Sequence, residues 1–111
     1  MLFCMHTRGV DISDPIRKFT REKLELALDR LEGRIERIHV YLTDINGPDR
    51  GGEDKAVRVV VRLHKQPSIV IEDIDSNMAV AIDRVTDRLG VAACRRLEKL
   101  RQHRPGWNRI E

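Results

Sequence analysis

The chain has 111 residues, of which 21 are Lys or Arg and 18 are Asp or Glu, so its formal net charge is +3. This length suits one domain with its own core, and the low aromatic content of 4% means that Val, Ile, Leu and Ala must build that core. No apolar run approaches the roughly twenty residues of a membrane helix, so we expect no membrane-spanning segment.

The first two predicted elements are a short strand and a helix. Residues 2–5 are apolar and suited to a β-strand. Asp14 followed by Pro15 predicts a helix start, because Asp caps free N–H groups and Pro fits the first helical position. An apolar stripe at helical spacing follows as far as Gly33, which suits the left-handed residue that ends a helix. The sequence therefore predicts one helix from Asp14 to Gly33.

Three predicted strands come next. Residues 37–43 alternate between apolar and polar side chains, and residues 57–64 repeat this pattern, as half-buried strands do. The turn formers of residues 46–52 predict a hairpin connection between these two strands. Residues 65–67 turn the chain again, and residues 68–74 supply the last strand.

The second predicted helix carries both an apolar and a basic side. Asp75 or Ser76 is the expected cap, and apolar residues then recur at spacings of three and four: Met78, Ile82, Val85 and Leu89. After residue 75 the chain holds eight Lys or Arg against four acids, a net charge of +4. This asymmetry indicates an anionic partner such as nucleic acid. The alternative is a solvated helix end whose cations suit the helix dipole.

These elements predict an α+β fold in the order β-α-β-β-β-α. Because each strand has one apolar face, we expect a four-stranded mixed sheet with two helices packed on one face and water on the other. The first two strands should be parallel, and the others should form an antiparallel meander. We expect one domain over residues 1–103 and a basic C-terminal tail over residues 104–111.

In this frame the sequence resembles the ribosome hibernation-promoting factor family, also called ribosome-associated inhibitors or sigma factor modulation proteins. Residues 77–83, Asn-Met-Ala-Val-Ala-Ile-Asp, followed by Asp-Arg-Leu at 87–89, are similar to the family's Asp-Met-Tyr-Ala-Ala-Ile-Asp and later Asp-Lys-Leu. Residues 10–14, Val-Asp-Ile-Ser-Asp, followed by Ile16 and Arg17, resemble the stretch that enters the family's first helix. The resemblance covers roughly residues 2–100.

The resemblance implies a fold like that of a double-stranded-RNA-binding domain and a non-enzymatic inhibitor of translation. Such a protein occupies the mRNA and tRNA channel of the small ribosomal subunit and acts in the cytoplasm under stress and in stationary phase. The implied partners are the small subunit and its rRNA, with no cofactor and no small-molecule substrate. By resemblance, the RNA-binding candidates are Arg17, Lys23, Arg88 and Arg95. Helical periodicity adds Arg84, Arg96 and Lys99.

Two other functions are open at this point. One is a regulatory protein-interaction module that keeps the fold without binding ribosomes, with the apolar residues 91–93 and the tail forming part of the contact. The other is a small hydrolase, which would require the acidic side chains of two segments to converge in one pocket. Those side chains are Asp44, Asp49, Glu53 and Asp54 in the first segment, and Glu72, Asp73 and Asp75 in the second.

Histidine, cysteine and aromatic residues give weaker signals. His39 and His64 can share the wet side of the sheet near Cys4 or His6, but their spacing is no metal-binding pattern, so we expect no metal. Two distant cysteines indicate reduced thiols in a cytoplasmic protein. The scarcity of aromatics favours recognition of RNA shape and backbone over stacking on single-stranded bases. Tyr41 is either a stacking residue or a bridge between strands.

Overall fold

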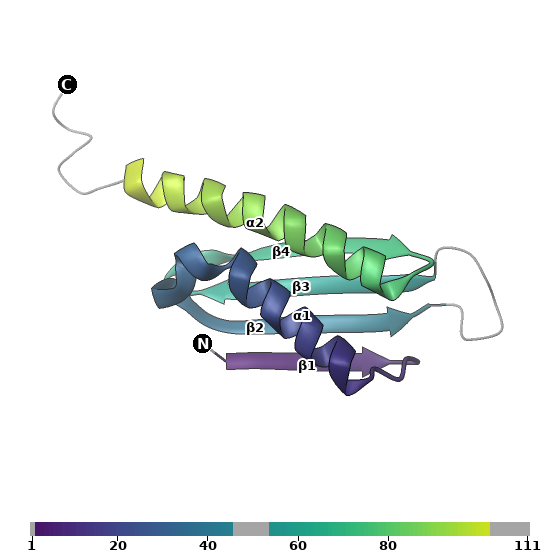
Figure 1. Cartoon of the computed structure of the whole chain (residues 1–111). Helices are drawn as coiled ribbons and strands as arrows, with labels where there is room; N and C mark the ends of the chain where they lie inside the picture. Colours follow the sequence, from purple (N-terminus) through teal and green to yellow (C-terminus); the bar gives the residue numbers. More distant parts are fainter. Residues whose placement is uncertain (1, 46–53, 103–111) are drawn as a thin grey trace, which may run out of the picture.

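The computed structural model describes residues 2–45 and 54–102 and has the predicted order of strands and helices (Figure 1). The elements are β1 (Leu2–Arg8), α1 (Asp14–Ala27), the 3-10 helix η1 (Asp29–Arg34), β2 (Ile35–Asp44), β3 (Lys55–Leu63), β4 (Gln66–Asp75) and α2 (Met78–Gln102). The predicted connection at residues 46–52 and the predicted tail at residues 104–111 lie outside the described residues.

The four strands form one mixed sheet in the order β1-β2-β3-β4. β1 pairs with β2 in parallel, and the β2/β3 and β3/β4 pairs are antiparallel, as predicted. β1 runs three residues beyond its predicted end at Met5, because its pairing with β2 continues to Arg8 opposite Thr43. The α+β fold class and its topology are therefore confirmed.

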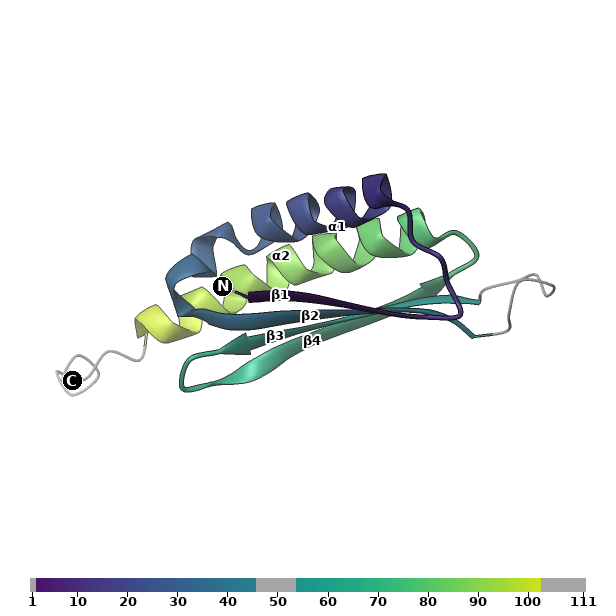
Figure 2. The same cartoon turned by 90° about the horizontal axis from the view of Figure 1, so that it is seen from below.

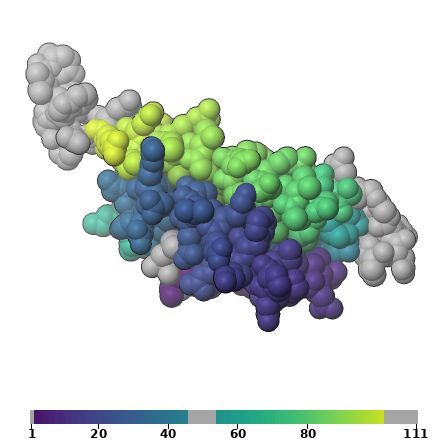
Figure 3. Space-filling model, viewed as in Figure 1, coloured from purple at the N-terminus to yellow at the C-terminus, as the bar shows by residue number. Residues whose placement is uncertain are grey.

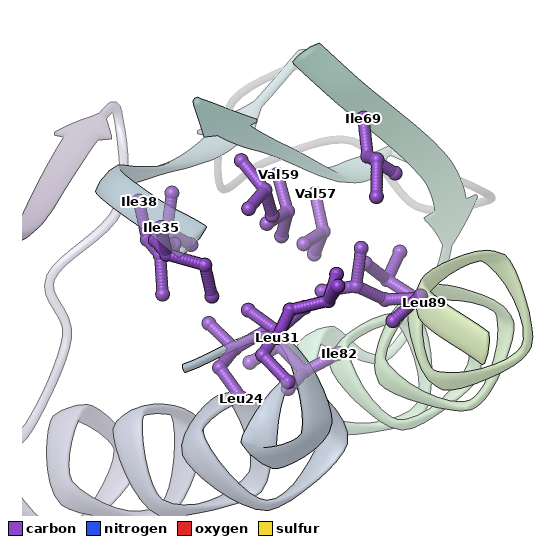
Figure 4. Packing of buried hydrophobic residues seen from close by; sticks show 14 of the residues in the cluster. Leu24, Leu31, Ile35, Ile38, Val57, Val59, Ile69, Ile82 and Leu89 are labelled. Carbon is purple, nitrogen blue, oxygen red and sulfur yellow. The ribbon is translucent and has the colours of Figure 1, made fainter. Parts of the chain in front are cut away.

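Both helices lie on one face of the sheet and leave the other face open (Figure 2). The core between the two layers is aliphatic, as the composition predicted (Figure 4). Leu24 of α1 and Leu89 of α2 are fully buried, and Val40 and Val59 face them from the sheet. This period-two burial in the strands fixes their register, since a slip of one residue would place Val and Ile side chains in water.

The end of α1 differs from the prediction. The α-helix ends at Ala27, and the chain tightens into η1, which contains Gly33 in a conformation without positive φ. Leu28 and Leu31 are both buried, and a 3-10 turn places residues three apart on the same side. The tighter turn thus continues the apolar stripe, and Gly33 is not the left-handed terminator that the sequence suggested.

Both predicted helix caps are displaced by one or two residues. Ser13, rather than Asp14, is the N-cap of α1, and its Oγ accepts a hydrogen bond from the Ile16 amide at 3.4 Å. Before α2 the cap is Asn77, whose Oδ1 accepts from the amides of Ala79 and Val80 at 2.9 and 3.3 Å. A cap must directly precede the first helical residue, which is Met78 in α2.

Candidate nucleic-acid interface

The predicted basic residues of α2 form a row along the side of the helix that lies over β4. We call this row the α2 basic strip, and it consists of Arg84, Arg88, Arg95, Arg96 and Lys99. Spacings of four, seven and eleven residues keep Arg84, Arg88, Arg95 and Lys99 close to one helical face, and Arg96 joins them through its contact with β4. Figure 3 shows the helix layer that carries the strip, with α1 and α2 side by side.

At the N-terminal end of the strip, carboxylates neutralise Arg84. Its Nε lies 2.7 Å from Asp73 Oδ2, and a terminal nitrogen lies 3.1 Å from Asp75 Oδ1. The same terminal nitrogen donates to the carbonyl oxygen of Ile74 at 3.1 Å. Two carboxylates around one guanidinium leave this end of the strip locally acidic. Arg84 therefore fastens α2 to the end of β4 and offers little free charge to a phosphate.

Further along the strip, two guanidinium groups are held by backbone carbonyls. Arg88 donates to the carbonyl oxygen of Glu72 at 2.8 Å, and Arg96 donates to that of Pro67 at 2.5 Å. A carbonyl oxygen orients a guanidinium without cancelling its charge, and Arg has five N–H donors. Arg88 and Arg96 therefore keep free donors in a fixed position, which is the arrangement that phosphate recognition needs.

The two remaining members of the strip, Arg95 and Lys99, have exposed side chains. Arg95 and Lys99 make no hydrogen bond or ion pair with any residue in the described part of the chain. Lys99 borders a shallow hollow beside Pro67 and Arg96. The free positive charge of α2 thus increases toward its C-terminal half.

The two predicted residues of α1 lie on different sides of that helix. Lys23 forms an ion pair with Asp83 of α2 and lies 5.5 Å from the Phe19 ring centroid, so it bridges the two helices. Arg17 lies on the β1 side, where it borders a hollow with Phe3 and Met5. Arg17 is exposed and has no ion pair within residues 2–45 and 54–102. The structure therefore joins five of the seven candidates into one strip and leaves Arg17 and Lys23 apart from it.

Comparison with known proteins decides the family. A family model described as "Sigma 54 modulation protein / S30EA ribosomal protein" matches residues 4–102. The chain belongs to this family. The match confirms the resemblance to hibernation-promoting factors, and members of this ribosome-associated family are in general non-catalytic. No curated protein sequence matches the chain.

Two solved structures show how closely the fold of this family is kept. A ribosomal subunit interface protein from Coxiella burnetii is 22% identical with a TM-score of 0.73, and the alignment covers 88% of this chain and 99% of that chain. The N-terminal domain of Protein Y from Thermus thermophilus is 26% identical with a TM-score of 0.67, and the alignment covers 85% of this chain and 96% of that one.

In this member of the family, the apolar stretch at residues 90–93 is largely part of the core. Ala93 is buried, Ala92 packs against the core and Gly90 approaches Ala27 of α1. Only Val91 is strongly exposed in this stretch, at 53%. One exposed valine is too small a surface to favour the protein-interaction module by itself, and the tail that was expected to share this contact lies outside the described residues.

The acidic residues that the structure describes do not converge in one pocket. Asp44 and Asp54 are largely buried and bind Lys55, with their oxygens 3.3 and 3.0 Å from its Nζ. The hydrogen bond that the Lys55 ammonium donates to Asp54 is the main reason that the pKa of Lys55 is raised. The second acidic group holds Arg84, and Asp49 and Glu53 lie outside the described residues. Asp44 and Asp54 therefore hold Lys55, Asp73 and Asp75 hold Arg84, and the carboxylate of Glu72 takes part in neither ion-pair group.

Histidine and cysteine residues also take structural positions. His6 Nε2 and His39 Nδ1 lie 3.1 Å apart, whereas His64 contacts Glu36 at 3.2 Å, away from that pair. In the described part of the chain no three His, Cys, Asp or Glu side chains gather where they could hold a metal ion. Cys4 and Cys94 are both free thiols. Within residues 2–45 and 54–102 no helix is long and apolar enough to span a bilayer.

One basic surface of this family member was not singled out from the sequence. The open face of the sheet carries exposed arginines from three strands: Arg8, Arg37, Arg58 and Arg62. Arg37, Arg58 and Arg62 occupy the polar positions of the period-two strands, so the pattern had already placed them on the wet face. The missing information was the strand order, which brings side chains far apart in sequence into neighbouring rows.

Proposed function

We propose that this protein inhibits translation by binding the small ribosomal subunit, without catalysing a reaction. The observation that carries the proposal is the family match over residues 4–102. The likeness to a protein named for the ribosomal subunit interface and to Protein Y supports the same conclusion. We place this activity in the cytoplasm, during stress and in stationary phase.

The contact with the subunit is proposed to be made with rRNA by the helix layer. The α2 basic strip supplies most of the charge, and Arg17 and Lys23 of α1 add cations apart from it. Arg95 and Lys99 have free charge, and Arg88 and Arg96 have guanidinium groups already held in place by carbonyls. Rigid cations at helical spacings can follow a phosphate backbone without losing much side-chain freedom on binding. Arg84 and Lys23 share their charge with carboxylates and should contribute least.

An initiation assay tests this proposal. Purified small subunits are mixed with mRNA and labelled initiator tRNA, with the protein added either before or after the tRNA. Added first and in excess, the protein should lower the yield of initiation complex. Complexes assembled beforehand should resist it, because the occupied channel excludes the protein. An unchanged yield with folded protein added first would contradict the proposed inhibition.

A further inference from the structure

The arginines of the open sheet face are unpaired, unlike the cations of the helix layer. Within the described residues, Arg8, Arg37, Arg58 and Arg62 make no ion pair and no hydrogen bond. Arg37 and Arg62 stand directly opposite each other on β2 and β3. Like charges in this position destabilise a sheet. Four unpaired guanidinium groups, two of them adjacent, give this face a chemistry suited to an anionic partner.

A row of aromatic rings lies among these arginines. His6 of β1 stacks on Tyr41 of β2 with ring centroids 4.7 Å apart and an interplanar angle of 14°. His39 stacks on His6 at 5.4 Å and lies 6.1 Å from Tyr41. Because His6 covers one face of the tyrosine ring, the other face of Tyr41 is the one that can receive a further ring. Tyr41 is the largest member of this row and is 37% exposed.

Beside Tyr41 the sheet surface is hollowed into an open groove of about 770 Å³. The lining of the groove mixes apolar side chains with one arginine and two carboxylates: Tyr41, Thr43, Ile45, Ala56, Val57, Arg58, Glu72, Asp73 and Ile74. Ile45 and Ile74 are 54% and 41% exposed although they are large apolar residues. Apolar side chains, an aromatic ring and a guanidinium donor are the groups with which proteins hold an unstacked base.

The electrostatic field over the face is positive. The pKa of His39 is lowered, first by desolvation and then by repulsion from His6, Arg37 and Arg62. Two acidic residues line the groove: Glu72 lies directly opposite Arg58 in the β3/β4 pairing, and Asp73 forms an ion pair with Arg84 of α2. The positive charge that favours a polyanion over an acidic protein surface therefore comes from Arg37 and Arg62, which lie opposite each other, rather than from the groove itself.

We propose that the open sheet face binds a single-stranded RNA segment, with phosphates on Arg37 and Arg62 and a base stacked beside Tyr41. Arg58 lies opposite Tyr41 on β3, and Arg8 lies opposite Thr43 on β1, so both add cations near the ring row. The spacing of about 3.3 Å per residue along β2 puts Arg37 and Tyr41 about 13 Å apart, a span that a short single-stranded RNA segment can cover. A duplex is excluded as the ligand of the groove because its base faces are covered by their neighbours.

This inference deepens the proposed function, on which it rests for RNA being the natural ligand. If both hold, the protein contacts RNA on two opposite faces, with duplex or folded rRNA on the helix layer and an unpaired segment on the sheet. The two surfaces share none of their basic residues, so substitutions can separate them.

The test uses the full chain and a fluorescein-labelled ten-nucleotide oligouridylate, with binding followed by anisotropy from low to moderate salt. R37A/R62A should weaken binding at low salt by tenfold or more. It should also reduce the slope of log affinity against log salt by about 1.4, since each single-strand phosphate contributes about 0.7. Tyr41→Ala should weaken binding about tenfold and Tyr41→Phe should restore it, because a base stacks on either ring. The matched control is R95A/K99A on the helix layer, which should change binding to the oligonucleotide by less than threefold.

Ultraviolet cross-linking supplies a second measurement, because Tyr41 is the only tyrosine in the chain. A cross-linked peptide containing Tyr41, together with the expected loss in R37A/R62A, would support the proposal. Wild-type affinity in the sheet variants, or equal losses in both double variants without a cross-link at Tyr41, would overturn it. Failure of the proposed function is distinguishable, since it would appear as loss of small-subunit binding while the oligonucleotide still binds.

Discussion

At the scale of single residues, Asn77 is the side chain that starts α2. Its Oδ1 accepts hydrogen bonds from the backbone amides of Ala79 and Val80 in the first turn, whereas Ser76 makes no such contact in the described structure. Asn77→Ala should therefore lower the free energy of unfolding by about 1 kcal/mol. Ser76→Ala is the matched control and should change it by less than about 0.5 kcal/mol. Urea denaturation measures both, and equal losses would contradict the assignment of the cap.

The lowered pKa of the stacked His39 predicts how the free energy of unfolding depends on pH. Its pKa is below the ordinary value of 6.5, so the folded chain takes up this proton less readily than the unfolded chain. The free energy of unfolding should therefore fall as the pH drops through 6.5, and the loss should be complete once the pH is below the folded pKa. Above pH 6.5 this group should have no effect. An NMR titration of the His39 ring, assigned with His39→Gln, checks the direction; a pKa above 6.5 would contradict it.

At the scale of elements, α1 and α2 approach each other closely at Gly90. A Cβ atom added there would lie 4.0 Å from the Cβ and the carbonyl oxygen of Ala27, which is ordinary van der Waals contact. Glycine inside a helix is unfavourable, so Gly90→Ala should raise the free energy of unfolding by about 0.5–1 kcal/mol. Gly90→Leu is too large for this approach and should lower it. Thermal unfolding measures both variants. A lower melting temperature for Gly90→Ala would contradict the prediction that the helix contact has room for one methyl group.

The cations of the helix layer should divide into two classes. R95A/K99A removes free charge, so it should weaken binding to the small subunit about tenfold and leave the melting temperature unchanged. K23A/R84A removes cations that pair with carboxylates, so it should cost about 0.2–1 kcal/mol of stability per pair and weaken binding less. Co-sedimentation and thermal melts measure the two effects. The reverse ranking of affinities would show that the paired residues make the contact.

How far the sequence predicts these elements depends on the kind of signal. Period-two burial in residues 37–43 and 57–64, and the stripe through Ile82 and Leu89, predict the strands, α2 and the core correctly, because burial itself produces these patterns. The caps and the 3-10 turn at Gly33 were predicted wrongly, since several neighbouring residues have similar capping or turn propensity and tertiary packing chooses among them.

The candidate site was less predictable than the fold. Periodicity correctly gathered Arg84, Arg88, Arg95 and Lys99 on one side of α2, but spacing contains no information about partners on other elements. The carboxylates that hold Arg84 come from β4, and the carboxylate that holds Lys23 comes from α2. The ring row of the sheet joins residues 33 and 35 positions apart in the chain, which only the parallel pairing of β1 with β2 brings together.

At the scale of the whole molecule, the protein is a thin two-layer domain (Figure 2). Basic side chains lie on both of its outer faces. Cations on opposite faces suit a protein that is inserted between two RNA surfaces better than one that binds a single flat surface. The core is confined to the single space between the layers, so substitutions on either outer face should leave the fold intact. This separation of core from surface is what makes the binding variants above interpretable.

Co-sedimentation with separated ribosomal subunits across a salt series tests the central claim most directly. We expect the protein to sediment with the small subunit at low salt and to be displaced by mRNA and initiator tRNA. If about six phosphates are contacted, the slope of log affinity against log salt should be roughly −4 to −5. Absence of small-subunit binding even at low salt, with the protein folded, would contradict the claim that this family member acts on the ribosome.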